Sequence, residues 1–127
     1  NNPLRTINTP LPQGLKEFVC FGCSLTELPL LPNSLETLWC SNNPLRTINT
    51  PLPQGLKEFV CFGCSLTELP LLPNSLETLW CSNNPLRTIN TPLPQGLKEF
   101  YCDNCSLTKK PVVNENTWMN DDNNLYN

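Results

Sequence analysis

The stretch Leu35-Glu36-Thr37-Leu38-Trp39-Cys40-Ser41-Asn42-Asn43-Pro44-Leu45 decides the fold of this chain. Written as a pattern, it reads L-x-x-L-x-C-x-x-N-x-L, a short strand followed by a turn. Because successive side chains of a strand point to opposite faces, Leu38 and Cys40 face inward and Trp39 faces outward. The pattern starts five times, at Leu15, Leu35, Leu56, Leu76 and Leu97. A chain that repeats one such unit is expected to fold as a stack of coils.

The repeats are verbatim copies over long stretches. Residues 1–41 and 42–82 are identical at every position, and residues 83–100 repeat the first 18 once more. Natural repeats drift apart, so we interpret the chain as a designed, de novo repeat array or as one cassette duplicated. Each cassette holds a 20-residue unit, 15–34, and a 21-residue unit, 35–55, which alternate along the stack.

The boundaries of the array follow from where the pattern begins and stops. At 127 residues the chain is one domain, with the repeat array at 1–107 and a C-terminal cap or tail at 108–127. We expect residues able to plug the last coil at Trp118, Met119, Leu125 and Tyr126. Residues 1–14 match the back half of a unit, so the first coil is predicted to be open. The matching positions are Asn2, Leu4, Ile7 and Leu11.

Composition narrows the classes of function. A net charge of −3 with both signs dispersed argues against nucleic acid, which requires a basic stripe. No apolar run approaches the roughly 20 residues of a membrane span. Fourteen prolines disfavour long helices. The segment Leu28-Pro29-Leu30-Leu31-Pro32 instead indicates an extended, polyproline-like back wall.

Together, the Leu28–Pro32 segment and the Leu35–Leu45 pattern carry a family resemblance over essentially residues 1–107. The chain resembles leucine-rich repeat proteins, and most closely the bacterial short-repeat subclass that includes domains of type III secreted effectors. The resemblance implies a curved solenoid with a five-stranded parallel β-sheet on its concave side, an irregular convex side and little helix. It also implies a protein-binding module. The chain departs from the family in its cysteines, which replace a usual Leu, Ile or Val in the strand and Asn in alternate turns.

Eight cysteines in a short chain would usually indicate a disulfide framework, but their placement does not. We expect free thiols packed as small apolar groups in one column, and therefore a reducing compartment such as the cytoplasm, or that of a recombinant host. The cysteines that share this inward position are Cys20, Cys40, Cys61, Cys81 and Cys102. In the turns, a ladder is predicted to alternate Cys23, Asn43, Cys64, Asn84 and Cys105.

The cysteines leave a metal hypothesis open. A three-thiolate site could form from Cys20, Cys23 and Cys40, and its copy from Cys61, Cys64 and Cys81. Our main prediction remains no metal and no cofactor. Catalysis has little support, because the chain has no His and no Ser or Cys beside an evident base. We therefore expect a protein that is not an enzyme.

The outward strand positions carry the candidate site. Neighbouring strands lie about 4.8 Å apart, so their apolar side chains should merge into one stripe, a binding or assembly surface. Two further rows of outward side chains flank the stripe and are expected to face solvent. One consists of Glu17, Glu58 and Glu99, and the other of Ser41, Ser82 and Asp103. The predicted stripe consists of Val19, Phe21, Trp39, Val60, Phe62, Trp80 and Tyr101.

Three explanations of the stripe compete: strand-forming residues that cover one another, self-association as a homodimer, and a groove for a protein or peptide. We interpret the chain as an engineered structural scaffold that self-associates through the stripe. A protein- or peptide-binding module is the alternative, and thiolate metal binding is a more distant one.

Overall fold

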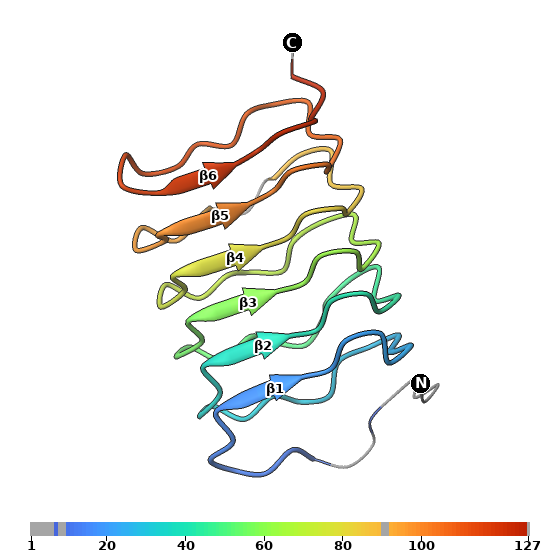
Figure 1. Ribbon diagram of the computed structural model, residues 1–127. Helices are drawn as coiled ribbons and strands as arrows, with labels where there is room; N and C mark the ends of the chain where they lie inside the picture. The colour runs from blue at the N-terminus through green and yellow to red at the C-terminus, as the bar shows by residue number, and fades with distance from the viewer. Residues whose placement is uncertain (1–6, 8–9, 90–91, 127) are drawn as a thin grey trace.

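Six short parallel strands form one sheet, in a computed structural model that describes residue 7, residues 10–89 and residues 92–126 (Figure 1). The predicted repeat solenoid is confirmed, but the predicted number of strands, five, was one too few. Asn2 and Leu4 lie outside the described residues. The strands, in chain and sheet order, are β1 (Glu17–Val19), β2 (Thr37–Trp39), β3 (Glu58–Val60), β4 (Thr78–Trp80), β5 (Glu99–Tyr101) and β6 (Trp118–Asn120).

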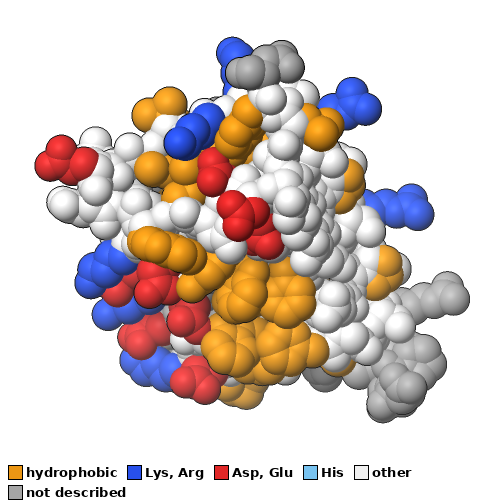
Figure 2. Space-filling model, turned by 45° about the horizontal axis from the view of Figure 1, so that its top comes forward, with side chains coloured by type: hydrophobic (Ala, Val, Ile, Leu, Met, Phe, Trp, Pro, Cys, Tyr) orange, Lys and Arg blue, Asp and Glu red, His pale blue; other side chains and the backbone are white. Residues whose placement is uncertain are grey.

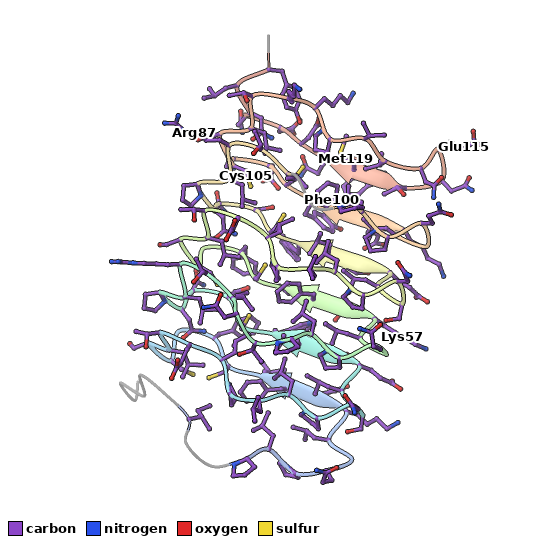
Figure 3. The ribbon with its side chains drawn as sticks, turned by 180° about the vertical axis from the view of Figure 1, so that it is seen from behind. Lys57, Arg87, Phe100, Cys105, Glu115 and Met119 are labelled. Carbon is purple, nitrogen blue, oxygen red and sulfur yellow. The ribbon has the colours of Figure 1, made fainter. Side chains whose placement is uncertain are left out.

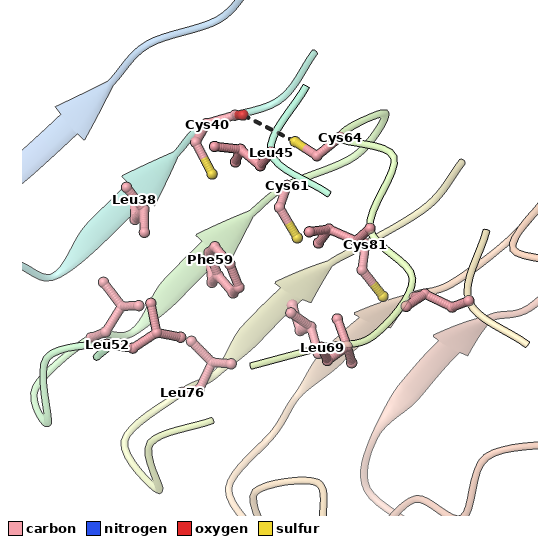
Figure 4. Packing of buried hydrophobic residues seen from close by; sticks show 14 of the residues in the cluster. Leu38, Cys40, Leu45, Leu52, Phe59, Cys61, Cys64, Leu69, Leu76 and Cys81 are labelled. Carbon is pink, nitrogen blue, oxygen red and sulfur yellow. Dashed lines mark hydrogen bonds between the residues drawn. The ribbon is translucent and has the colours of Figure 1, made fainter. Parts of the chain in front are cut away.

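The central residue of each strand points into the core. Leu38 pairs in register with Phe18 on one side and Phe59 on the other. Leu38, Phe59, Leu79 and Phe100 are fully buried. Leucines of the back wall, such as Leu52 and Leu69, close the interior from behind, and Leu76 adds to it from just before β4 (Figure 4). Each coil therefore buries its apolar face only against its neighbours, as expected of a solenoid.

The sixth coil comes from the segment predicted to be a cap. Met119 follows Phe100 by 19 positions, whereas Leu38 follows Phe18 by 20, so the last unit is one residue shorter. That shift places Met119 inward and Trp118 on the outer face. Met119 and Tyr126 do pack against the core. The expectation that Trp118 and Leu125 plug the end was wrong, since both are exposed.

The back wall is irregular, as predicted: turns and extended segments connect the strands, and the described residues contain no helix. Gly63 shows how tight the turn after a strand is. Its φ is +66°, and a Cβ there would lie 2.5 Å from Asn42 Oδ1. Glycine adopts this left-handed conformation at no steric cost, whereas a side chain at this position would have to displace the Asn42 amide. No helix able to cross a membrane is found in the described ranges.

Candidate functional site

Aromatic rings form a connected row across the outer face of the sheet, which we call the aromatic face. The rings come from β2, β4, β5 and β6 and, after β1 and β3, from the residue two positions past the end of the strand. Trp118 was not predicted to belong to this row, because the one-residue shift that turns it outward beside Tyr101 was not anticipated. The ring-centroid separations are 5.8 Å for Phe21–Trp39, 6.4 Å for Phe21–Phe62, 5.2 Å for Phe62–Trp80, 4.7 Å for Trp80–Tyr101 and 5.2 Å for Tyr101–Trp118.

Exposure along the aromatic face is uneven. Val19, Phe21 and Trp80 are 50%, 45% and 37% exposed, while Trp39, Phe62 and Tyr101 are half-buried. Val60 points to the same face but is only 5% exposed. It lies in register between Trp39 and Trp80, whose large rings cover it. The accessible part of this face therefore consists almost entirely of aromatic rings and Val19.

The serines beside the aromatic face do not face solvent, contrary to the prediction from strand alternation. Ser41 and Ser82 are buried. Phe21 and Phe62, from the coils on either side of Ser41, meet above it. Ser41 Oγ accepts a hydrogen bond from Phe62 N at 3.1 Å, and the Ser82 hydroxyl donates to Asp103. These small side chains let the large rings of neighbouring coils close together.

Carboxylates border the aromatic face, and a shallow hollow of about 190 Å³ lies between the two groups. Trp39 Nε1 donates to Glu58 Oε1 at 2.6 Å. Trp80 instead stacks on Tyr101 with an interplanar angle of 27°. Figure 2 shows a cluster of apolar side chains with acidic side chains next to it. The hollow is lined by Phe21, Trp39, Glu58, Val60, Phe62, Thr78, Trp80, Glu99 and Tyr101.

Inside the coils, asparagine satisfies the backbone of the turns. Asn43 Oδ1 accepts hydrogen bonds from Cys23 N at 2.8 Å and Leu25 N at 3.0 Å. Its Nδ2 donates to Cys20 O at 2.7 Å and Cys40 O at 2.9 Å. Asn84 repeats this arrangement two coils later, and Asn124 makes the same bonds to Cys105 N and Leu107 N in the sixth coil.

Cysteine takes the alternate turn positions, as predicted, and makes fewer bonds there. Cys64 Sγ donates to Cys40 O at 3.1 Å, shown as the dashed line in Figure 4. Cys105 Sγ donates to Cys81 O at the same distance. Because a thiol is a weak donor, these contacts bind neighbouring coils less firmly than the amide of Asn43.

The strand cysteines form the predicted interior column of free thiols. Burial raises the pKa of Cys61 well above 9.0. Burial, with a smaller effect of the neighbouring Cys23 thiol, raises the pKa of Cys20 to about 12. Cys23 is the only one of the eight cysteines that is not buried. Within the described residues no three His, Cys, Asp or Glu side chains converge on a metal position, so the three-thiolate hypothesis has no geometric support.

The other hollows lie on the irregular wall, which Figure 3 shows from behind with Arg87 at the periphery. One is lined by Ile48, Leu52 and Leu72 with prolines and amides around them. Another is lined by Ile89, Leu93 and Val112 beside two lysines. Neither hollow gathers a nucleophile with a base, so the aromatic face remains the candidate site.

Comparison with known proteins agrees with this architecture. The family model described as Leucine Rich Repeat matches residues 34–59 and 75–97. Each matched segment begins just before a Thr-Leu-Trp strand, β2 or β4, and includes the asparagine turn that follows it. A comparison with curated proteins gives no match.

Proposed function

Since this chain is a leucine-rich repeat protein built from short units, we propose that it is a non-catalytic scaffold whose aromatic face binds an extended protein segment. Such solenoids commonly serve structural or protein-binding roles. The observation that carries the proposal is the unbroken row of ring contacts from Phe21 to Trp118.

The dimensions of the aromatic face suit a short peptide. Six strands at a spacing of about 4.8 Å span about 24 Å between the first and the last. An extended chain advances about 3.4 Å per residue, so about seven residues cover that distance. Tryptophan and tyrosine supply large contact area with little rotamer entropy to lose on binding.

A selection of seven-residue peptides on the immobilised protein tests the proposal. We expect the selected peptides to lose about tenfold or more in affinity for the variant Trp80→Ser, since large aromatic residues dominate interface energies. The matched control is Leu71→Ser, which removes an exposed apolar side chain from the irregular wall. Peptides that bind Trp80→Ser unchanged, or that lose affinity for Leu71→Ser instead, would contradict the proposal.

Self-association is the second candidate function, supported by one specific observation. Val19 and Phe21 are the most exposed apolar side chains at the β1 end of the aromatic face. Two copies could cover these residues in a twofold dimer. Sedimentation at about 100 μM tests this: a dimer that dissociates in Phe21→Ser supports it, and a monomer excludes it.

The origin and compartment of the chain belong to the same proposal. We infer an engineered array from the verbatim 41-residue copying, and a reducing compartment from eight unpaired cysteines. The first inference predicts that no natural genome encodes this verbatim tandem copy of the 41-residue cassette. The second predicts that all eight thiols titrate in denaturant when the protein is produced in a reducing cytoplasm.

A further inference from the structure

The two tryptophan–glutamate pairs of the aromatic face differ although their cassettes are identical copies. Trp39 Nε1 donates to Glu58, whereas Trp80 turns its ring onto Tyr101. The cause is the residue beside each tryptophan: Val60 neighbours Trp39, while Tyr101 replaces valine beside Trp80. Stacking on Tyr101 leaves Glu99 without a hydrogen-bonding partner among the described residues.

The lysines do not neutralise this carboxylate. In the described part of the chain the ion pairs are Lys16–Glu36 at 3.5 Å and Lys98–Glu77 at 3.7 Å. Both involve the glutamates that precede the Thr-Leu-Trp strands. Glu99 is exposed at the edge of the hollow, and Asp103 lies on the opposite border of the rings. The rings of Trp80 and Tyr101 therefore lie between two carboxylates that form no ion pair among the described residues, and Asp103 accepts hydrogen bonds only from the neutral side chains of Ser82 and Asn104.

The combination of aromatic rings and nearby carboxylates favours the binding of a cation. The face of an indole or phenol ring carries negative electrostatic potential and attracts a guanidinium or ammonium group. A purely apolar occupant would remove water from Glu99 without replacing its hydrogen bonds, which is unfavourable. Arginine fits better than lysine, because a planar guanidinium can lie flat on a ring while its edge donates two hydrogen bonds to a carboxylate.

We propose that the hollow beside Trp80, Tyr101 and Glu99 binds an arginine side chain of the extended segment. The proposal rests on the proposed function and adds the chemical class of the residue that is recognised. Glu58, already bonded to Trp39, also lines the hollow, two strands from Glu99 in the same row, and orients that indole.

The test uses the capped peptide Thr-Val-Thr-Arg-Thr-Val-Thr and two versions with citrulline or glutamate at the centre. Citrulline keeps the shape of arginine and removes its charge. Binding is followed by the NMR signals of the three tryptophan indole N–H groups. We expect the arginine peptide to shift the Trp80 signal, with an affinity about tenfold above that of the citrulline peptide. The glutamate peptide should bind least.

Variants assign the effect to the site. Glu99→Gln should lower the affinity for the arginine peptide about fivefold and leave that for citrulline unchanged. Glu68→Gln is the control, because it removes an equal charge from an exposed position outside the hollow. Equal binding of arginine and citrulline peptides at Trp80 would overturn arginine recognition and leave the binding face standing. Failure of all three peptides to shift the Trp80 signal would also overturn arginine recognition. The binding face is tested separately, by the peptides selected on the immobilised protein.

Discussion

Asn84 shows how much of the fold depends on a single side chain. Its Oδ1 accepts hydrogen bonds from Cys64 N at 2.8 Å and Leu66 N at 3.0 Å, and its Nδ2 donates to Cys61 O and Cys81 O. All these groups are buried, so removing the amide leaves several of them without partners. An unsatisfied buried polar group is more destabilising than a lost exposed hydrogen bond.

The first prediction compares Asn84→Ala with Cys64→Ala by urea unfolding. We expect Asn84→Ala to lower the free energy of unfolding by about 3 kcal/mol or more, and Cys64→Ala by about 1–2 kcal/mol. The exposed Asn74→Ala serves as the control and should change it little. A larger loss for Cys64→Ala than for Asn84→Ala would show that asparagine does not hold the turns.

The second prediction concerns the accessibility of the thiols. Seven of the eight cysteines are buried, and Cys23 alone is partly exposed. Because alkylation requires an accessible thiolate, Cys23 should react with iodoacetamide at pH 8 far faster than the other seven. Peptide mapping by mass spectrometry identifies the modified residue. Rapid reaction of Cys40 or Cys81 in the folded protein would contradict the inward register.

The third prediction is that stability falls in alkaline solution. The pKa of Cys20 is raised to about 12 and that of Cys61 is raised well above 9.0. Below pH 8 both states keep these protons. Above pH 9 the unfolded chain releases them while the folded chain retains them, so the free energy of unfolding decreases. The urea midpoint should fall between pH 8 and 10, less steeply for Cys61→Ala. A urea midpoint that stays constant between pH 8 and 10 would contradict the prediction.

At the scale of elements, strand alternation separates two chemically identical residues. Phe59 lies at the centre of β3 and is fully buried, whereas Phe21 lies two residues past β1 and is 45% exposed. The fourth prediction is that Phe59→Ala costs about 3–5 kcal/mol of stability and Phe21→Ala about 1 kcal/mol. Thermal unfolding measures both. Similar losses for the two variants would mean that the strands have no distinct inner face.

The sequence predicted the first five strands because each keeps the alternation of an inward Leu or Phe with an outward neighbour. It did not predict β6, because the unit that leads to this strand is one residue shorter. The shorter unit exchanges the inward and outward positions, so Met119 faces inward and Trp118 faces outward. Pairing of β6 with β5 and the amide bonds of Asn124 override that weak pattern. A local pattern cannot reveal a register that neighbouring coils impose.

The candidate site was predictable in its residues and not in its contacts. Alternation placed Trp39 and Trp80 outward, but it could not show that these rings cover Val60 or that phenylalanines close over Ser41. Nor could it distinguish Trp39, bonded to Glu58, from Trp80, stacked on Tyr101. Ring positions depend on side chains from adjacent coils, which come together only in the folded stack.

On the scale of the whole molecule, the apolar core is more completely buried near β5 than near β1. Phe100 is fully buried beside Met119 of the sixth coil, whereas Leu15 and Phe18 of the first full unit are only partly buried. In a solenoid each coil is stabilised chiefly by its neighbours. The strand centres of β1 and β6, which each have one described neighbour strand, are only partly buried, whereas the four centres between them are fully buried.

The fold and the binding face both require that the inward thiols and the outward rings lie on opposite sides of one sheet. The most direct test is the NMR signal loss caused by a neutral paramagnetic gadolinium chelate, which reports distance from solvent residue by residue. We predict strong loss for the indole N–H groups of Trp80 and Trp118, and protection of the backbone amides of Cys61 and Leu66. Protected indoles together with broadened Cys61 and Leu66 amides would contradict the fold's register and the binding face with it.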